Sequence, residues 1–276
     1  MKKFCHINGK ILLEEDASVS INDLGLLRGY AVFDFLRTYN GRPFLLQEHL
    51  NRLENSAKLV GLKVPLSKVR ISKIIDELLK KNKLKETTIK IIVTGGASKD
   101  GLTFDINSPT VIIIAKEIHQ LQVELYKKGV KMITYDFQRN NSGAKTTDYI
   151  TMLKLQNKKE KQKAFEILYV NRGLVLEGAT SNIFFFKKNT LITPKNNILA
   201  GTIRKFVLGL AKKKFKVEER DVKVNEIKSI TEAFLTSTTR EVLPVVKIDS
   251  NKIGNAKVGE NTKWLMDVFK NKTYLL

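Results

Sequence analysis

The sequence predicts an α+β protein of two domains, and three observations support this fold class. A chain of 276 residues, 42% of them hydrophobic, is long enough to bury a large core and to divide into two domains. Short apolar runs typical of β-strands alternate along the chain with runs that have helical spacing. The pattern weakens between Ile118 and Val123, so we place a smaller domain at 1–120 and a larger one at 121–276.

The first domain is expected to hold two hairpins, two helices and two further strands. Asn8-Gly9 and Asn40-Gly41 are dipeptides that readily take positive φ in tight turns, and apolar runs flank them. Apolar residues three and four apart predict a helix that ends at Gly61, and Ser67 is the predicted N-cap of a second helix. The predicted elements are a hairpin at 4–13, a strand at 31–39 that turns back into Phe44, helices at 47–60 and 68–81, and strands at 88–94 and 110–116.

The second domain is expected to contain many short strands with helices between them. This alternation predicts a barrel-like or mixed sheet. The predicted strands lie at 130–135, 165–171, 174–176, 183–186, 233–236 and 242–248, and the predicted helices at 149–163, 202–213 and 261–269.

Composition excludes several classes of protein. The longest apolar stretches, 111–115 and 183–186, are far shorter than the roughly 20 residues that cross a bilayer, and the basic start lacks the apolar core of a signal peptide, so we expect a cytoplasmic protein. One cysteine, Cys5, excludes an intrachain disulfide and a cysteine-cluster metal site. The three histidines, His6, His49 and His119, form no close ligand pair, so no metal site is expected.

The formal net charge of +21 raises the alternative of a nucleic-acid-binding protein. The lysines are scattered over every predicted helix and turn, and no aromatic-interleaved RNA motif or basic zipper accompanies them. We therefore interpret the charge as solvated helix faces and keep nucleic-acid binding as the non-enzymatic alternative.

Lys145 follows three small or polar residues, Ser142-Gly143-Ala144, at the point where irregular chain gives way to a helical pattern. A lysine held in a pocket loses solvation, its pKa falls, and its neutral amine can attack an aldehyde. With so many lysines in the chain, a surface role is the alternative interpretation of this residue alone.

About thirty residues later, Glu177 starts a small polar turn between two apolar strands. A carboxylate held there would keep a pyridine nitrogen protonated, which makes a cofactor with such a ring an electron sink. The alternative is a hairpin turn whose glutamate faces water.

The two segments together, Lys145 to Tyr149 and Glu177-Gly178-Ala179-Thr180-Ser181-Asn182-Ile183-Phe184, resemble the signature of the class IV aminotransferases. That family includes branched-chain aminotransferases, D-amino acid aminotransferases and aminodeoxychorismate lyases. The resemblance implies a fold-type IV enzyme with a smaller N-terminal α/β sandwich-like domain and a larger C-terminal pseudo-barrel domain that carries the catalytic lysine. It also implies pyridoxal 5'-phosphate as cofactor, an amino acid and a 2-oxo acid as substrates, and a homodimer.

The resemblance assigns roles to individual residues. Lys145 would carry the cofactor as a Schiff base and move the proton between the α-carbon and the cofactor's C4′ carbon, Glu177 would contact the pyridine nitrogen, and Tyr149 the phenolic oxygen. Arg52 would bind the phosphate, and a helix start after Gly201 offers the unpaired N–H groups that suit an anion, although an ordinary helix cap is the alternative. The remaining implied cofactor contacts are Ser181, Asn182, Thr202, Ile203 and Thr238.

Departures from the family pattern bear on the substrate. Arg28 stands where family members commonly have an aromatic residue, and it would bind a carboxylate with two prongs or form an ordinary ion pair. Thr239-Arg240 replaces the Ala-Ala pair typical of branched-chain enzymes, and the run from Lys90 lacks their Tyr-x-Arg-Pro motif. These departures favour a D-amino acid transaminase over a branched-chain enzyme, and an aminodeoxychorismate lyase stays as a further alternative. The predicted substrate contacts are Arg28, Tyr30, Phe33, Lys90, Thr239 and Arg240, of which Lys90 has a solvent-facing strand-edge position as its alternative.

Overall fold

The computed structural model describes residues 3–274, and its contacts divide the chain into two compact units. Of the described residues, unit 1 contains 3–119 together with Gly143–Asp148, and unit 2 contains Gln120–Ser142 and 149–274. The sequence predicts that the segment around Lys145 belongs to the second domain, but the structure groups this segment with unit 1. The reason is a pair of main-chain hydrogen bonds to the strand at 31–39. Phe33 N–H donates to Lys145 O (2.9 Å), and Thr147 N–H donates to Ala31 O (3.1 Å).

Unit 1 is built on one antiparallel six-stranded sheet. Its order is β2-β1-β6-β5-β3-β4, and each neighbouring pair is antiparallel. The first hairpin turns on Asn8 and Gly9, which both have positive φ (46° and 88°), as the sequence predicts. The strands are β1 (Phe4–Ile7), β2 (Lys10–Leu13), β3 (Ala31–Tyr39), β4 (Arg42–Pro43), β5 (Thr87–Thr94) and β6 (Val111–Glu117).

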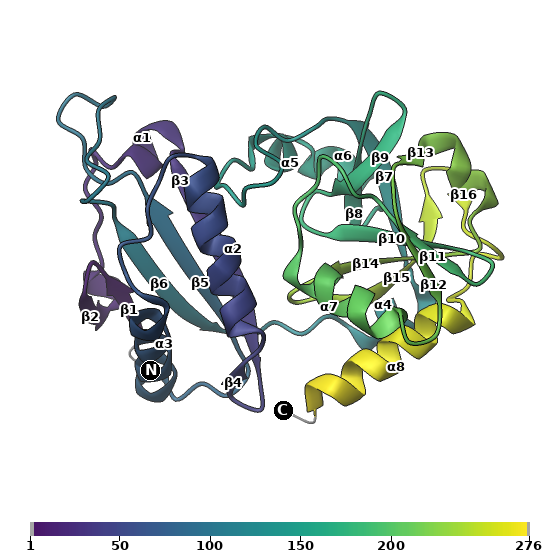
Figure 1. The fold of residues 1–276 in the computed structure, drawn as a ribbon, viewed down its shortest axis with the longest axis horizontal. Coiled ribbons are helices and arrows are strands. Elements are labelled where there is room, and N and C mark those ends of the chain that lie inside the picture. The colour runs from purple at the N-terminus through teal and green to yellow at the C-terminus, as the bar shows by residue number, and fades with distance from the viewer. Residues whose placement is uncertain (1–2, 275–276) are drawn as a thin grey trace. The chain divides into compact units, whose positions relative to one another are not determined.

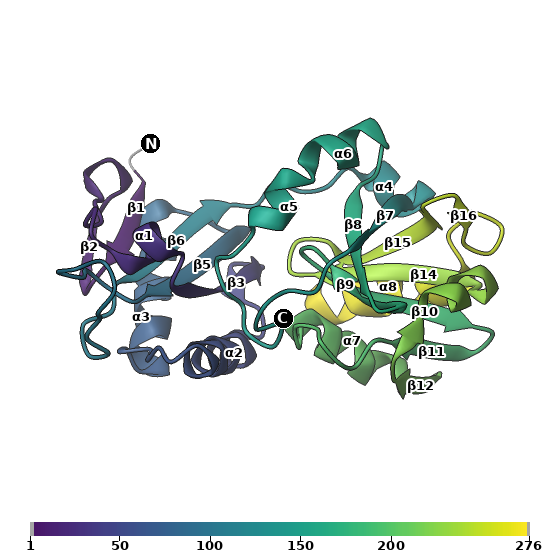
Figure 2. The ribbon, with the colours of Figure 1, turned by 90° about the horizontal axis from the view of Figure 1, so that it is seen from above.

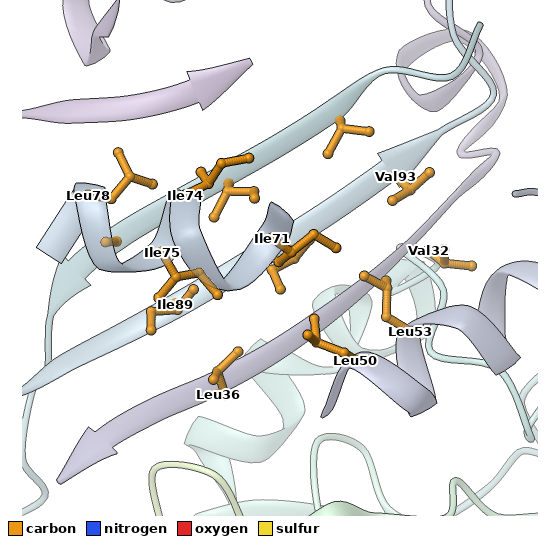
Figure 3. Packing of buried hydrophobic residues seen from close by; sticks show 14 of the residues in the cluster. Val32, Leu36, Leu50, Leu53, Ile71, Ile74, Ile75, Leu78, Ile89 and Val93 are labelled. Carbon is orange, nitrogen blue, oxygen red and sulfur yellow. The ribbon is translucent and has the colours of Figure 1, made fainter. Parts of the chain in front are cut away.

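Two helices cover one face of this sheet, α2 (Leu46–Leu59) and α3 (Lys68–Asn82), as Figures 1 and 2 show. The core between them is aliphatic. Figure 3 shows Leu50 and Leu53 of α2 beside β3, which carries Val32 and Leu36, and Ile75 of α3 next to Ile89 of β5; all belong to one buried cluster. Side chains alternate along a strand, so the residues between Val32 and Leu36 divide between this core and the opposite face. The Ser67 side chain accepts a hydrogen bond from Arg70 N–H (3.2 Å), which confirms the predicted N-cap.

Two short elements of unit 1 were not predicted from the sequence, η1 (Glu14–Asp16) and α1 (Leu24–Arg28). Helix α1 has only five residues, too few to display helical periodicity. Asp23 starts it by accepting a hydrogen bond from Gly25 N–H (2.7 Å), and Gly29 ends it at φ 64°.

Unit 2 holds a ten-stranded mixed sheet that curls into a half-barrel. The order is β12-β11-β10-β14-β15-β7-β8-β9-β13, and β16 pairs with β15. Pairs such as β7 with β8 and β15 with β7 are parallel, while β14 with β15 and β8 with β9 are antiparallel. The strands are β7 (Val130–Asp136), β8 (Glu166–Asn171), β9 (Leu174–Gly178), β10 (Asn182–Lys187), β11 (Thr190–Thr193), β12 (Lys216–Glu219), β13 (Val222–Lys223), β14 (Glu232–Ser237), β15 (Glu241–Ile248) and β16 (Asn251–Lys252).

The helices of unit 2 are α4 (Val123–Lys128), α5 (Ile150–Lys154), α6 (Gln156–Lys161), η2 (Val224–Ser229), α7 (Thr202–Ala211) and α8 (Glu260–Tyr274). The single helix predicted at 149–163 is two helices, because the helix breaks at Leu155. No helix within residues 3–274 is both long enough and apolar enough to span a membrane. The α+β class with two units, one sandwich-like and one curled, is confirmed.

Candidate active site

Unit 1 contains a buried charged cluster between β3 and α2. Asp34, on β3, has no exposed surface, and Arg52, on α2, grips it with two parallel hydrogen bonds, Nε to Oδ2 (2.8 Å) and Nη2 to Oδ1 (2.9 Å). His49 Nδ1 lies 2.6 Å from Asp34 Oδ1. A carboxylate can only accept, so this ring nitrogen carries the proton and donates. The fork-on-fork geometry fixes the plane of the Arg52 guanidinium.

The charges in this cluster follow from burial and pairing. Burial alone would raise the pKa of Asp34, but the Arg52 guanidinium and the hydrogen bonds from His49 and Arg52 outweigh it and hold that pKa well below its usual range. Burial lowers the pKa of His49, and the charges of Arg52 and Lys145 lower it further against the opposing effect of Asp34. The cluster therefore consists of a carboxylate, a guanidinium and a neutral imidazole.

Lys145 is held from two sides within unit 1. Its main-chain N–H donates to Ser56 Oγ (3.1 Å), and its carbonyl accepts from Phe33 N–H (2.9 Å). The amine Nζ lies 4.5 Å from the centre of the Phe33 ring, within the range of a cation–π contact. The backbone of Lys145 is thus fixed by neighbours on α2 and β3, and its amine packs on an aromatic face.

Lys90, on β5, lies 4.9 Å from the same ring, measured from Nζ to the centre of Phe33. The strand is flanked by β6 and β3, so Lys90 is not on a sheet edge, and the side chain is half-buried. Burial lowers the pKa of Lys90, and the neighbouring charge of Lys116 lowers it further. The structure thus brings Lys90, Phe33 and Lys145 together.

Arg28 and Tyr30 have other surroundings. The exposed Arg28 side chain donates from Nε to Gly101 O (3.1 Å) and from Nη1 to Leu27 O (3.2 Å). The Tyr30 hydroxyl donates to Val60 O (2.8 Å), and burial raises its pKa. Both polar groups are engaged with main-chain carbonyls of unit 1.

In unit 2, Glu177 at the end of β9 is buried and held by two donors. Arg139 Nε donates to Oε1 (2.9 Å) and Leu199 N–H donates to Oε2 (3.0 Å). Arg139 Nη2 also donates to Ser142 O (2.6 Å), which ties the arginine to its own segment. The alternative of a glutamate that faces water is wrong.

Tyr149 precedes α5 in unit 2 and acts electrostatically on Tyr169 of β8. Burial raises the pKa of Tyr169, and Glu166, Glu177 and Tyr149 raise it further, while Arg139 opposes them. The phenol of Tyr169 is therefore a neutral group beside the Glu177 carboxylate.

The N-terminus of α7 offers unpaired donors. Gly201 caps the helix without any side-chain hydrogen bond, and within residues 3–274 the N–H groups of Thr202 and Ile203 have no partner, although both residues are buried. A Cβ on Gly201 would lie 2.0 Å from Asn182 Oδ1, so the close approach of Asn182 requires a glycine there. Asn182 Nδ2 in turn donates to Leu199 O (2.9 Å).

The turn between β14 and β15 carries the next predicted residues. Ser237 pairs with Glu241, so Thr238, Thr239 and Arg240 form a three-residue loop that closes with Glu241 at φ 55°.

Arg240, at the end of that loop, places its guanidinium against the buried Glu166 and the partly buried Thr180 and Phe165 of unit 2. Nη1 pairs with Glu166 and donates to Thr180 Oγ1 (2.8 Å), and the guanidinium carbon lies 5.0 Å from the centre of the Phe165 ring. Thr180 Oγ1 also donates to Glu166 Oε2 (2.6 Å). Next to Thr180, Ser181 Oγ is buried without a hydrogen-bond partner within residues 3–274.

Four residues of these clusters were missed by sequence reasoning: Asp34, Ser56, Arg139 and Glu166. A signal existed for Asp34, because an acidic residue midway between Val32 and Leu36 occupies a core-facing position of a strand. The contacts of the other three with Glu177, Lys145 and Arg240 join residues distant in sequence, so no local pattern marks them.

A family model described as amino-transferase class IV matches residues 31–248. The chain belongs to the class IV aminotransferases.

Relatives with different named activities resemble this class IV aminotransferase along almost its whole length. A putative branched-chain-amino-acid aminotransferase of Methanocaldococcus jannaschii is 36% identical, over 96% of this chain and 95% of the relative. A D-alanine aminotransferase of Bacillus licheniformis is 31% identical, again over 96% and 95%. The crystal structure of a T.th. branched-chain amino acid aminotransferase with pyridoxamine 5'-phosphate matches with a TM-score of 0.90 at 25% identity, over 99% of this chain and 95% of that one.

Class IV aminotransferases depend on pyridoxal 5'-phosphate, and the enzyme's residues fit that cofactor. In unit 1, Arg52 donates from Nε and Nη2 to Asp34, and its Nη1 donates no hydrogen bond within residues 3–274. In unit 2, the unpaired N–H groups of Thr202 and Ile203 suit a phosphate. Buried donors without an acceptor are costly unless a ligand satisfies them, so the α7 N-terminus is the observation that carries the fit.

Proposed function

We propose that this class IV aminotransferase moves the amino group of a D-amino acid to a 2-oxo acid. The observation that carries the proposal is the cluster of Arg240 with Glu166 and Thr180, at the position where branched-chain enzymes typically have two alanines. Its ion pair brings a guanidinium and a carboxylate to a region that would otherwise be lined by methyl groups. An isobutyl or isopropyl side chain gains little beside such charged groups, which disfavours leucine and valine as substrates.

The position of Lys90 supports the proposal that the substrate carries an α-carboxylate. Its half-buried ammonium is next to the Phe33 ring, on which the amine of Lys145 also packs. We propose that Lys90 binds the carboxylate, with Phe33 lining the substrate side. Arg28 and Thr239 are the further proposed substrate contacts, and Tyr30 supports this region through its hydrogen bond to Val60 O.

The proposed catalytic residue is Lys145. When bound, pyridoxal 5'-phosphate supplies the carbonyl carbon that takes up the amino group and a ring that withdraws electrons from the α-carbon. Lys145 Nζ removes the proton from the α-carbon of the amino acid and returns a proton to the α-carbon of the 2-oxo acid in the reverse half-reaction.

The other proposed contacts hold the cofactor. Glu177, fixed by Arg139 and Leu199 N–H, keeps a ring nitrogen protonated, and Tyr149 donates to the phenolic oxygen. Arg52 and the α7 N-terminus bind the phosphate, together with Thr238. Ser181 Oγ, buried without a hydrogen-bond partner within residues 3–274, is a donor available to the same ligand.

A branched-chain L-amino acid aminotransferase is the second candidate, because the Methanocaldococcus relative carries that name at 36% identity. The two candidates differ in the hand and the side chain of the donor. The enzyme with bound cofactor is assayed with D-alanine, D-glutamate, L-leucine and L-valine against 2-oxoglutarate. We expect turnover with the D-amino acids, and turnover confined to L-leucine and L-valine would refute the D-amino acid proposal. Pyruvate released from aminodeoxychorismate without an amino acceptor would identify a lyase.

An Arg240→Ala variant sharpens the assay. Removing the guanidinium should raise the ratio of L-leucine to D-alanine turnover by about 10-fold, since one apolar contact changes specificity by roughly 1–3 kcal/mol. Thr239→Ala, in the same loop but without the ion pair, is the matched control and should change the ratio less. We also propose a homodimer, which sedimentation of the holoenzyme tests directly.

A further inference from the structure

One face of helix α2 carries His49, Arg52 and Ser56 at spacings of three and four residues, so all three side chains project from the same side. Their contacts lie entirely in unit 1. Arg52 and His49 reach Asp34 on β3, and Ser56 reaches the main chain of Lys145. A single rigid helix therefore connects the proposed phosphate-binding arginine with the proposed cofactor lysine.

We propose that Asp34 and Ser56 are positioning residues of the cofactor site, Asp34 acting through the guanidinium of Arg52 and Ser56 through the main-chain N–H of Lys145. The inference rests on the proposed roles of Arg52 and Lys145. Neither Asp34 nor Ser56 touches reacting atoms in this scheme.

The geometry of the hydrogen bonds between Asp34 and Arg52 supports the positioning role of Asp34. Both of its oxygens accept from Arg52, and a long arginine side chain that would otherwise sample many rotamers is held in one plane. That plane commits Nε and Nη2 to Asp34, so Nη1 is the nitrogen left to donate elsewhere. His49 Nδ1 and the main-chain N–H of Phe35 also donate to the same carboxylate, which offsets the cost of burying it completely.

A direct hydrogen bond to the main chain of Lys145 supports the positioning role of Ser56. Its side chain is fully buried, and its Oγ is the acceptor for Lys145 N–H. The segment 143–148 is irregular and is held to the sheet by main-chain bonds at Phe33 and Thr147. The Ser56 contact fixes the main-chain N–H of Lys145, whose carbonyl already accepts from Phe33 N–H, so the amine extends from an immobilised backbone.

The experiment compares two probes on the full-length chain stripped of cofactor: pyridoxal 5'-phosphate and pyridoxal, which lacks the phosphate. For Asp34→Asn we expect the dissociation constant of pyridoxal 5'-phosphate to rise by about 10-fold or more, the effect of disturbing a charged hydrogen bond. The constant for pyridoxal should change by no more than about twofold. Equal weakening of both probes, or weakening of neither, overturns the role of Asp34.

A double variant separates this inference from the proposed function. If Asp34 acts only through Arg52, then Asp34→Asn adds nothing to Arg52→Gln in the ratio of the two constants. Failure of Arg52→Gln itself to lower the preference for pyridoxal 5'-phosphate overturns the phosphate assignment. A lower preference in Arg52→Gln together with an unchanged one in Asp34→Asn overturns the positioning role alone.

Ser56→Ala provides the milder variant should the buried Asp34 substitution prevent folding. It should slow the appearance of the borohydride-trapped Lys145 adduct by roughly 5-fold for both probes, which corresponds to about 1 kcal/mol for one neutral hydrogen bond. The ratio between the probes should stay the same, because the phosphate contact is intact. Asn55→Ala, exposed on the same helix, is the control and should match the wild-type protein. A wild-type trapping rate in Ser56→Ala overturns its role.

Discussion

The two units hold the proposed cofactor residues by opposite arrangements of charge. In unit 1 a buried carboxylate, Asp34, is the support, and the cation Arg52 is the group that it orients. In unit 2 the cation Arg139 is the support, and the buried carboxylate Glu177 is the group held in place, with Leu199 N–H as second donor. An ion pair alone therefore does not show which partner meets the ligand, and the remaining contacts of each partner decide it.

The largest expected loss of turnover comes from a substitution among the proposed cofactor residues of unit 1. Replacing Lys145 by Ala removes the only amine that the scheme uses for proton transfer, so turnover should fall by at least about 10³-fold. The measurement is transamination of the preferred donor, with borohydride labelling and peptide identification. Lys90→Ala is the control on the same Phe33 ring, and it should raise KM while Lys145 remains labelled. Labelling of the Lys145→Ala chain at another lysine would contradict the assignment.

The sequence suggests the residues proposed to contact the cofactor more readily than the residues that hold them in position. Lys145, Glu177 and Arg52 lie in local motifs, and Gly201 marks a helix start, so a few neighbouring residues are enough to propose them as cofactor contacts. Arg139 is 38 positions before Glu177, and Ser56 is 89 positions before Lys145. Such pairings are set by how strands and helices pack, which one sequence does not display.

Element prediction shows the same limit. The strand at 31–39 and the helix capped by Ser67 follow from period and capping, and both are found. The short edge strands β12 and β13 were not predicted, because two to four residues of mixed polarity carry no periodic signal. The grouping of the Lys145 segment with unit 1 depends on long-range main-chain bonds that no local pattern encodes.

The next largest loss of turnover is expected from substitutions among the proposed cofactor residues of unit 2. Glu177→Gln keeps the shape of the side chain and removes its charge, so turnover should fall by roughly 100-fold, the usual loss for one preorganised electrostatic contact. Arg139→Gln should cause a smaller loss, because Leu199 N–H still holds Oε2. Steady-state kinetics of both variants checks the order. A larger loss for Arg139→Gln than for Glu177→Gln would show that the arginine, not the carboxylate, is the group that meets the ligand.

Glycine substitutions at the start of α7 and within it give an intermediate effect in the same unit. Gly201→Ala places a Cβ 2.0 Å from Asn182 Oδ1, so the helix start or the buried Asn182 side chain, which is bonded to Leu199 O, must move, at a cost of about 1–3 kcal/mol in the free energy of unfolding. Gly209→Ala is the matched control in the same helix, where an added Cβ meets nothing within 4 Å. It should stabilise the enzyme by about 0.5–1 kcal/mol. Thermal denaturation with and without pyridoxal 5'-phosphate measures both, and only Gly201→Ala should lose cofactor affinity.

The smallest effect is a difference in pH dependence between the units, because all three histidines lie in residues 1–119. Burial lowers the folded-state pKa of His49, which faces Asp34, Arg52 and Lys145, and that of His6, which faces Arg70 and Glu77. As pH falls below the ordinary histidine value of 6.5, the unfolded chain binds protons that the folded unit does not. The stability that these neutral rings contribute is thus present above pH 6.5 and is lost below it, by up to about 1.4 kcal/mol per pH unit for each ring. Opening free energies from hydrogen exchange, corrected for intrinsic rates, should fall in unit 1 and stay level in unit 2 between about pH 6.5 and 5.5. His49→Gln keeps a donor for Asp34 without titrating, so it should reduce the slope in unit 1, and an equal slope in both units would show that the histidines are not its source.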